Sequence, residues 1–249
     1  MTRVIAIANQ KGGVGKTTSA VNLAYFLSLA GLDTLLIDLD PQANATSSLG
    51  IPFPTTSPFL GKGIEALETA IEKCDGERLW VIPARPGLDV APLLTSMPPT
   101  FVSSMREALK RFEYVIVDSP PAFGAITKFA LLLADSVLIP LQCEYLAMEG
   151  LSQMLAVLPR LSSARKQALE IEGLLLTMFS EDSHCANVVE EVSTHFPAET
   201  LRCIIPRDVT LAEAASHALP VFRYSPRSRG SWAYLTLAKE ILNGREEAR

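Results

Sequence analysis

The sequence predicts an α/β fold in which a mostly parallel, twisted sheet carries helices on both of its faces. Three observations indicate it: short apolar, β-rich runs alternate with helical segments, no repeat or linker separates a second unit, and 48% of the 249 residues are hydrophobic. This hydrophobic content excludes a disordered chain, and the length suffices for one large core. We therefore expect a single domain over residues 1–249.

Glycine, proline and charged residues divide the first half of the chain into short elements. The apolar run 3–8 predicts a strand, and 16–30 predicts a helix that Gly31 ends, since glycine commonly follows the last helical residue. The apolar run 34–37 predicts a second strand, whereas the turn-rich stretch 52–63 predicts a mobile surface loop. Two short strands are then expected at 80–83 and 88–91, and a helix at 100–111.

The second half continues the alternation of strands and helices. The β-rich run 114–117 ends on Asp118, and the run 136–139 ends on Pro140. Two more apolar runs predict the remaining strands, at 174–177 and 201–205. Helices are expected around Phe129, Ser152, Glu190 and Ala214 and over 231–242.

Charge and cysteine content exclude several classes of function. The net charge of −5 gives no overall attraction to nucleic acid or to an anionic membrane. The apolar runs are too short to span a bilayer, and the N-terminus lacks a signal peptide, so we expect a cytoplasmic protein. The cysteines lack metal or redox spacing, which predicts buried, reduced thiols at Cys74, Cys143, Cys185 and Cys203.

A glycine-rich loop between the first strand and the first helix predicts a phosphate-binding site. Its glycines let the backbone amides face an anion, and the helix adds the positive end of its dipole. Lys16 places an ammonium against terminal phosphates, and the Thr17 hydroxyl suits Mg²⁺. The residues expected to bind ATP with Mg²⁺ are Lys11, Gly12, Gly13, Val14, Gly15, Lys16, Thr17 and Thr18.

This loop departs from the general phosphate-loop pattern at one position. The pattern G-x-x-x-x-G-K-[ST] places glycine at position 10, where this chain has Gln10. Lys11 compensates by adding a second lysine at the start of the loop.

Three carboxylates follow the predicted strands. Asp118 is expected to hold Mg²⁺ through water, as the Walker B acid does in P-loop enzymes. Asp40 is expected to orient the attacking water and is also a candidate Mg²⁺ ligand. Asp38 is the structural alternative, because an acid at a strand end often only caps a neighbouring helix. The expected catalytic residues are Lys11, Lys16 and Asp40.

Together these stretches resemble the ParA/Soj partitioning ATPases, of the deviant Walker A (MinD/ParA) class of P-loop NTPases. The resemblance spans nearly the whole chain. Besides the lysine-rich loop, the matching stretches are Asp38-Leu39-Asp40-Pro41-Gln42-Ala43-Asn44-Ala45-Thr46, Asp118-Ser119-Pro120-Pro121, Gln142-Cys143-Glu144-Tyr145, Glu149-Gly150-Leu151, Ile205-Pro206-Arg207 and Tyr224-Ser225-Pro226-Arg227-Ser228-Arg229-Gly230.

The resemblance implies an ATP-dependent dimer switch. Two subunits of the family sandwich two nucleotides, and the lysine that matches Lys11 reaches the partner's phosphates. Pro206 and Arg207 resemble the base-proximal loop, where a proline packs on adenine. Family members have weak ATPase activity that a ParB-like centromere-binding protein stimulates, and their ATP-bound homodimers bind DNA nonspecifically. The expected function is the partitioning of a chromosome or plasmid, in the cytoplasm or at the nucleoid.

Three other functions fit parts of the pattern. A MinD-like, membrane-associated division regulator would carry a basic amphipathic C-terminal helix, whereas residues 243–249 are charge-mixed and lack large apolar side chains. A metabolic enzyme of the nitrogenase-reductase or kinase type would need cluster cysteines or a substrate pocket, and neither is evident. A ParA-like ATPase that positions a protein cargo shares every motif, so the sequence leaves it open.

The positions that relatives use for DNA differ in this chain. The resemblance places DNA-binding arginines at positions where this chain has Glu181 and Thr210, and a lysine where it has Leu219. One cation is thus reversed in sign and another is neutralised, so we expect weak or absent DNA binding at physiological salt. The basic residues that remain nearby are Arg202, Arg207, Arg223, Arg227 and Arg229.

Overall fold

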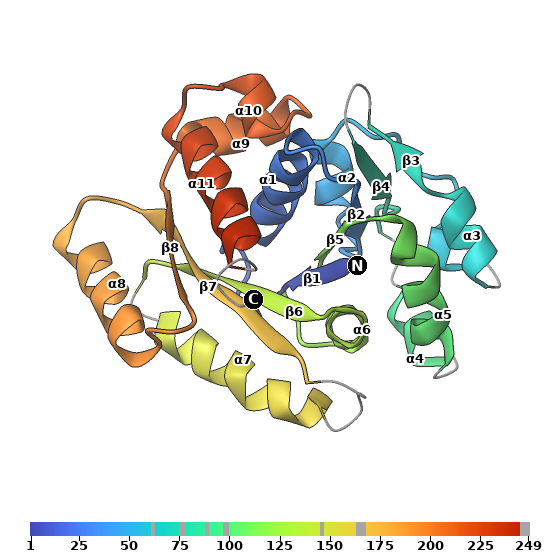
Figure 1. The fold of residues 1–249 in the computed structure, drawn as a ribbon, viewed down its shortest axis with the longest axis horizontal. Coiled ribbons are helices and arrows are strands. Elements are labelled where there is room, and N and C mark those ends of the chain that lie inside the picture. Colours follow the sequence, from blue (N-terminus) through green and yellow to red (C-terminus); the bar gives the residue numbers. More distant parts are fainter. Residues whose placement is uncertain are drawn as a thin grey trace.

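The strands of the computed structural model form one sheet (Figure 1). The structure describes residues 1–60, 63–74, 78–87, 90–96, 100–144, 147–162 and 168–244. The strands in these ranges are β1 (Arg3–Ile7), β2 (Thr34–Asp38), β3 (Glu72–Lys73), β4 (Leu79–Ile82), β5 (Tyr114–Asp118), β6 (Ser136–Gln142), β7 (Glu170–Phe179) and β8 (Thr200–Pro206). Their order is β3-β4-β2-β5-β1-β6-β7-β8, and every pair is parallel except β3 with β4. The predicted fold class is confirmed.

Helices cover both faces of this sheet. The α-helices in the described ranges are α1 (Lys16–Leu29), α2 (Asn44–Ser48), α3 (Ile64–Thr69), α4 (Ala91–Ser96), α5 (Thr100–Ala108), α6 (Ala125–Leu133), α7 (Ala147–Ser162), α8 (Ser183–His195), α9 (Val209–Ser216), α10 (Val221–Tyr224) and α11 (Arg229–Asn243). Figure 1 shows α1 and α11 on one face, and α6 and α7 on the other. The faces alternate along β1: Ile5 and Ile7 pack with α1 and α11, whereas Val4 and Ala6 pack with α6 and α7. The central strands are therefore buried on both sides.

The sheet topology brings three strand ends together. β5 lies between β1 and β2, with Asp118 opposite Ile7 on one side and opposite Asp38 on the other. Because all three strands run parallel, the loops that follow them emerge at the same edge. The glycine-rich loop follows β1, and Asp40 follows β2. The fold thus gathers the predicted phosphate loop and the predicted acids.

Two strand predictions need correction. β6 does not end at Pro140 but continues to Gln142. Its pairing with β1 ends at Leu138, so the N–H that Pro140 lacks is not needed for a hydrogen bond to β1. The side chain of Asn9 donates to the Pro140 carbonyl at 2.7 Å instead. Of the strand expected at 88–91, residues 88–89 lie outside the described ranges, and Ala91 begins α4.

The sheet edge beside β4 is formed by β3 instead. Glu72 and Lys73 of β3 pair antiparallel with Val81 and Trp80. Lys73 Nζ lies 5.5 Å from the centre of the Trp80 ring, a cation–π contact. A short, charged strand such as β3 gives the sheet an edge that resists pairing with another chain.

The stretch expected to be a mobile surface loop is anchored in the core. Phe59 is only 3% exposed and makes an edge-on contact with Phe129 of α6. Residues 61–62 of this stretch lie outside the described ranges, as do Tyr145 of the quoted motifs and residues 245–249 of the tail. In the part of the chain that the structure describes, no helix has the length and apolar character to cross a membrane.

Candidate functional site

The glycine-rich loop after β1 adopts a shape that requires glycine. Gly13 and Gly15 have φ angles of 76° and 86°, in the left-handed region that other residues rarely adopt. Gly15 directly precedes α1, so the loop turns into the helix N-terminus. The Thr177 hydroxyl of β7 donates to the Val14 carbonyl at 3.0 Å and ties the loop to the sheet. The loop is thereby held with its open side toward solvent.

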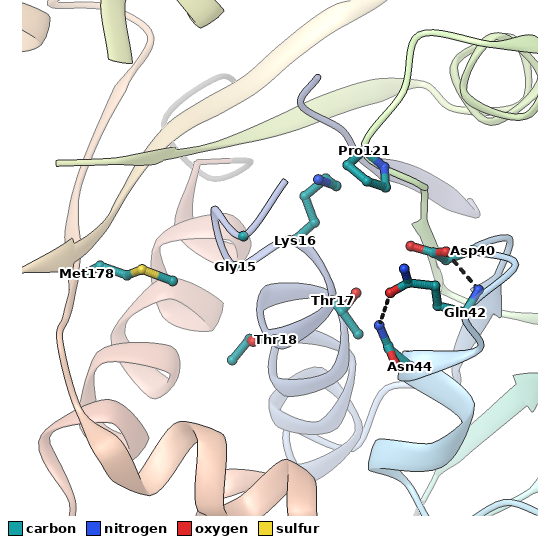
Figure 2. A pocket seen from close by; sticks show the side chains of 10 residues that line it. Gly15, Lys16, Thr17, Thr18, Asp40, Gln42, Asn44, Pro121 and Met178 are labelled. Carbon is teal, nitrogen blue, oxygen red and sulfur yellow. Dashed lines mark hydrogen bonds between the residues drawn. The ribbon is translucent and has the colours of Figure 1, made fainter. Parts of the chain in front are cut away.

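A pocket of about 340 Å³ lies against this loop (Figure 2). It opens at the N-terminus of α1, where backbone amides and the helix dipole favour an anion. Figure 2 shows Lys16 and Thr17 near Asp40, with Met178 on the opposite side. The lining residues are Gly13, Gly15, Lys16, Thr17, Thr18, Asp40, Gln42, Asn44, Pro121 and Met178. Of the predicted phosphate-loop residues, Lys11, Gly12 and Val14 do not line it.

Lys16 is held inside the loop as a buried cation. Its side chain is buried, and its Nζ donates to the Lys11 carbonyl at 3.0 Å. Burial lowers the pKa of Lys16, and the nearby carboxylates of Asp118 and Asp40 only partly oppose that effect. A bound phosphate would favour the charged form and take the ammonium as its counter-charge. Lys16 therefore has the position that anion binding needs.

Asp118 and Thr17 form an oxygen pair beside Lys16. The Thr17 hydroxyl donates to Asp118 Oδ2 at 2.7 Å, whereas the fully buried Asp118 Oδ1 has no hydrogen-bond partner in the described ranges. Burial and the neighbouring Asp38 carboxylate raise the pKa of Asp118. A carboxylate and a hydroxyl are ligands that Mg²⁺ accepts, and a cation would relieve the unpaired oxygen. The residues present thus fit a Mg²⁺ site.

Asp38 and Asp40 differ in what their carboxylates contact. Asp40 lines the pocket, and its Oδ1 accepts a hydrogen bond from the Gln42 N–H at 2.9 Å (Figure 2). Asp38 does not line this pocket. Its Oδ1 accepts a hydrogen bond from the Asp40 N–H, and its Oδ2 accepts hydrogen bonds from the N–H and the hydroxyl of Thr46. Burial raises the pKa of Asp38 to about 6. The geometry gives Asp40 access to a ligand and assigns Asp38 a structural role.

Lys11 lies beside the pocket and pairs with an acid of its own chain. Its Nζ is 2.8 Å from Glu144 Oε2, and its backbone N–H donates to Asn9 Oδ1 at 3.1 Å. The Gln142 side chain also donates to the Glu144 carboxylate. Lys11 holds the pKa of Glu144 below its usual range. In one copy of the chain, Lys11 thus rests on Glu144.

Pro206 and Arg207 lie next to the strand that closes the pocket. Pro206 ends β8 opposite Phe179 of β7, and Arg207 N–H donates to the Phe179 carbonyl at 2.8 Å. Neither residue lines the phosphate pocket itself. Both lie beside Phe179, the residue that follows Met178 in the chain. The expected base-proximal position stays a prediction.

Sequence reasoning gave no role to several residues that line the pocket. Gln42, Asn44 and Pro121 stand in the quoted motifs, and the side chains of Asn44 and Gln42 bond each other at 3.0 Å. Their positions just after β2 and β5 were the available signal. Met178 had no such signal. It has a φ of 55° and lies at an irregularity in the β7–β8 pairing, which the sequence does not reveal.

The expected DNA-binding positions Glu181, Thr210 and Leu219 lie near the N-termini of α8, α9 and α10, respectively. The Glu181 carboxylate is 3.6 Å from Arg229 Nη1, and both side chains are mostly exposed. Thr210 is bound to Asp208 Oδ1 through its N–H and its hydroxyl, at 3.0 and 2.7 Å, which caps α9. The acid at position 181 therefore pairs with one of the arginines that remain.

Similar proteins are found by sequence and by structure. A family model described as an AAA domain matches residues 2–171. The sporulation initiation inhibitor protein Soj of Bacillus subtilis is 42% identical, over 97% of this chain and 98% of its own. The chromosome partitioning protein ParA of Myxococcus xanthus is 40% identical, over 96% and 88%. The solved structure of cobyrinic acid a,c-diamide synthase from Mycobacterium smegmatis, with bound ATP analogue and magnesium, has a TM-score of 0.83 and 30% identity, over 100% of this chain and 98% of that one.

Proposed function

This chain belongs to the Soj/ParA family of partitioning ATPases, and we propose that it is an ATP-dependent dimerising switch that partitions DNA with a ParB-like centromere-binding partner. The observation that carries the proposal is the buried Lys16 ammonium beside the Thr17–Asp118 pair at the mouth of an open pocket. The proposed ligands are ATP and Mg²⁺. The similarity to chromosome-partitioning relatives supports the proposed dimerisation and the proposed partner.

The chain's own groups account for nucleotide binding. Lys16 would exchange its bond to the Lys11 carbonyl for one to the terminal phosphates, and the loop amides would hold the other phosphates. Thr17 and Asp118 would hold Mg²⁺, the hydroxyl directly and the carboxylate through water. Mg²⁺, when bound, neutralises charge that develops on the phosphates. Thr18, also on the pocket wall, offers a further hydroxyl.

Asp40 is the residue proposed to orient the attacking water. It lies on the pocket wall opposite the sheet end that carries Met178 (Figure 2). Its Oδ1 is fixed by the Gln42 N–H, which leaves Oδ2 for a water or for the magnesium shell. Phosphoryl transfer needs positioning more than covalent chemistry from the protein, so one aimed carboxylate suffices for this role.

Lys11 is proposed to act on the partner's nucleotide. Its Glu144 pair is partly exposed, so the lysine loses little free energy when it leaves that carboxylate. A triphosphate of the facing subunit offers a stronger, charge-assisted acceptor. The Lys11–Glu144 pair would then form in the monomer, and in the dimer Lys11 would contact the partner's triphosphate in place of Glu144.

Lys11→Ala is expected to bind ATP with near-normal affinity yet to remain a monomer. The reason is that Lys16 and the loop amides serve the nucleotide of their own chain, whereas Lys11 serves the facing one. Sedimentation of the variant with a slowly hydrolysed ATP analogue, beside the wild type, tests both this role and the proposed switch. Lys110→Ala, at an exposed lysine paired with Glu107, is the matched control. A Lys11→Ala dimer of wild-type affinity would rule out the role across the interface.

DNA binding by the ATP dimer is expected to be weak at physiological salt. The Glu181 carboxylate repels phosphates and pairs with Arg229, and Thr210 supplies no charge. Glu181→Arg is expected to raise affinity about tenfold, because a hydrogen bond to a charged group contributes roughly 1.5–3 kcal/mol. It should also steepen the plot of log affinity against log salt by about one unit. Filter binding across salt measures both, with the additional substitution Asp40→Ala to block hydrolysis and hold the protein in its ATP-bound state.

Glu190→Arg is the control for this experiment. Glu190 is exposed on α8, and its replacement changes net charge by the same amount without touching Arg229. Tight, steeply salt-dependent binding by the parent protein would show that the remaining arginines suffice. No binding even at low salt, before and after Glu181→Arg, would favour the second candidate function, a ParA-like ATPase that positions a protein cargo.

A further inference from the structure

A buried hydroxyl lies behind the Asp40 loop, at the centre of a chain of hydrogen bonds. Thr46 of α2 is fully buried and does not line the pocket. Its hydroxyl donates to Asp38 Oδ2 at 2.7 Å and accepts from the Ala84 N–H at 2.9 Å. The hydroxyl thereby uses its donor and an acceptor on the protein itself, and has no contact with the pocket.

Asp38 connects Thr46 to Asp40 through hydrogen bonds to both residues. The Asp38 Oδ2 atom also accepts a hydrogen bond from the Thr46 N–H at 2.8 Å, so Thr46 donates two hydrogen bonds to that oxygen. The other oxygen, Oδ1, accepts from the Asp40 N–H at 3.1 Å. The orientation of the Asp38 carboxylate therefore sets where the backbone of Asp40 begins its turn.

Further hydrogen bonds hold the turn that begins at Asp40. The Asp40 carbonyl accepts from the Ala43 N–H at 2.8 Å, and Ala43 has a φ of 54°, unusual for a residue with a side chain. The segment after β4 holds the same loop from outside, through the Ala84 N–H on Thr46 and the Gly87 N–H on the Pro41 carbonyl at 2.9 Å. Thr46 is the point where the inner and outer contacts meet.

We infer that Thr46 is a positioning residue for ATP hydrolysis, which acts by holding Asp38 and, through it, Asp40 in the geometry that aims the attacking water. The inference rests on the proposed function of Asp40. A displacement of about 1 Å in a positioning group can reduce a reaction rate roughly a hundredfold, whereas it leaves contacts elsewhere in the pocket unchanged. Loss of the Thr46 hydroxyl should therefore change turnover and not nucleotide affinity.

Thr46→Val removes the hydroxyl and keeps the branched shape. It leaves the buried Ala84 N–H without its acceptor and Asp38 Oδ2 with one donor fewer. We expect kcat for ATP hydrolysis to fall about tenfold, with KM and the ATP binding stoichiometry within about twofold of the wild type. Thr46→Ser, which restores the hydroxyl, should recover most of the rate.

Thr34→Val is the matched control. Thr34 is equally buried at the opposite end of β2, and its hydroxyl donates to the Leu32 carbonyl at 3.1 Å. The same substitution there should leave kcat unchanged, because it touches nothing near Asp40. Asp38→Asn is the second variant if Thr46→Val does not fold, and it should also lower kcat at unchanged KM.

The possible results separate this inference from the proposed function. Steady-state turnover and ATP binding are measured on the full chain with Mg²⁺. A tenfold lower kcat at constant KM, rescued by serine, supports the role of Thr46. Asp40→Ala, which removes the proposed water-orienting carboxylate, is measured beside these variants and is expected to be inactive. If it is, wild-type kcat in Thr46→Val, a loss confined to KM, or failure of serine to rescue would overturn the role of Thr46. No hydrolysis by the wild type, or full hydrolysis by Asp40→Ala, would instead overturn the proposed function.

Discussion

Lys16→Ala is expected to weaken ATP·Mg²⁺ binding by two to three orders of magnitude. Lys16 is the buried cation of the pocket, and its replacement leaves the terminal phosphates without their main counter-charge. Removal of one partner from a buried, hydrogen-bonded charge pair costs about 2–5 kcal/mol, and each 1.4 kcal/mol is tenfold in affinity. Isothermal titration with ATP and Mg²⁺ measures the loss directly.

The fold of the Lys16→Ala protein should be intact. Burial disfavours the charged form of Lys16 in the empty pocket, so its removal costs the nucleotide-free protein little. Thermal unfolding without nucleotide should therefore match the wild type, whereas the stabilisation by added ATP should disappear. Lys110→Ala, away from the pocket, should behave as the wild type in both assays. Near-normal affinity and turnover in Lys16→Ala would refute the assignment of the phosphate site.

Asp40→Ala is expected to reduce ATP hydrolysis by about two orders of magnitude or more, a typical contribution of a group that manages the attacking water. Asp40 lies on the pocket wall but outside the glycine-rich loop and the start of α1 that would hold the phosphates, so ATP affinity should change little. The variant should accumulate as an ATP-bound dimer, because the step that ends the dimer state is blocked. Single-turnover kinetics and gel filtration with ATP give the two measurements.

Asp33→Ala provides the comparison for Asp40→Ala. Asp33 directly precedes Thr34, the first residue of β2, at the end of the strand away from Asp40. Its Oδ1 pairs with Arg78 Nε at 2.8 Å on the surface. Its loss should leave hydrolysis and dimerisation at wild-type values. If Asp40→Ala hydrolyses ATP as fast as the wild type, Asp40 is structural, and the roles of the two acids after β2 have to be exchanged.

The parts of the site that depend on local sequence could be predicted. The apolar run of β1, the glycines and the start of α1 at Lys16 follow from short-range rules, and they place the loop and Lys16 correctly. The acids after β2 and β5 could also be brought together in advance. Parallel strands end at a common edge, so Asp40 and Asp118 had to lie near the loop.

The parts that depend on long-range contacts could not be predicted. Pro140 looked like a strand end because the sequence does not show where β1 stops beside it. The pairing of Lys11 with Glu144 joins residues 133 positions apart. The network that joins Thr46 to Ala84 likewise needs the β2–β4 pairing, which no local pattern specifies. These contacts arise from the packing of the whole sheet.

The proposed switch requires that ATP, and not ADP, joins two copies of this chain. The direct test is analytical ultracentrifugation of the wild-type protein with Mg²⁺ and either ADP or a slowly hydrolysed ATP analogue, over a range of protein concentrations. We expect a 27.0 kDa species with ADP and a species of twice that mass with the analogue. A 27.0 kDa species under both conditions, at nucleotide concentrations that saturate the pocket, would contradict it.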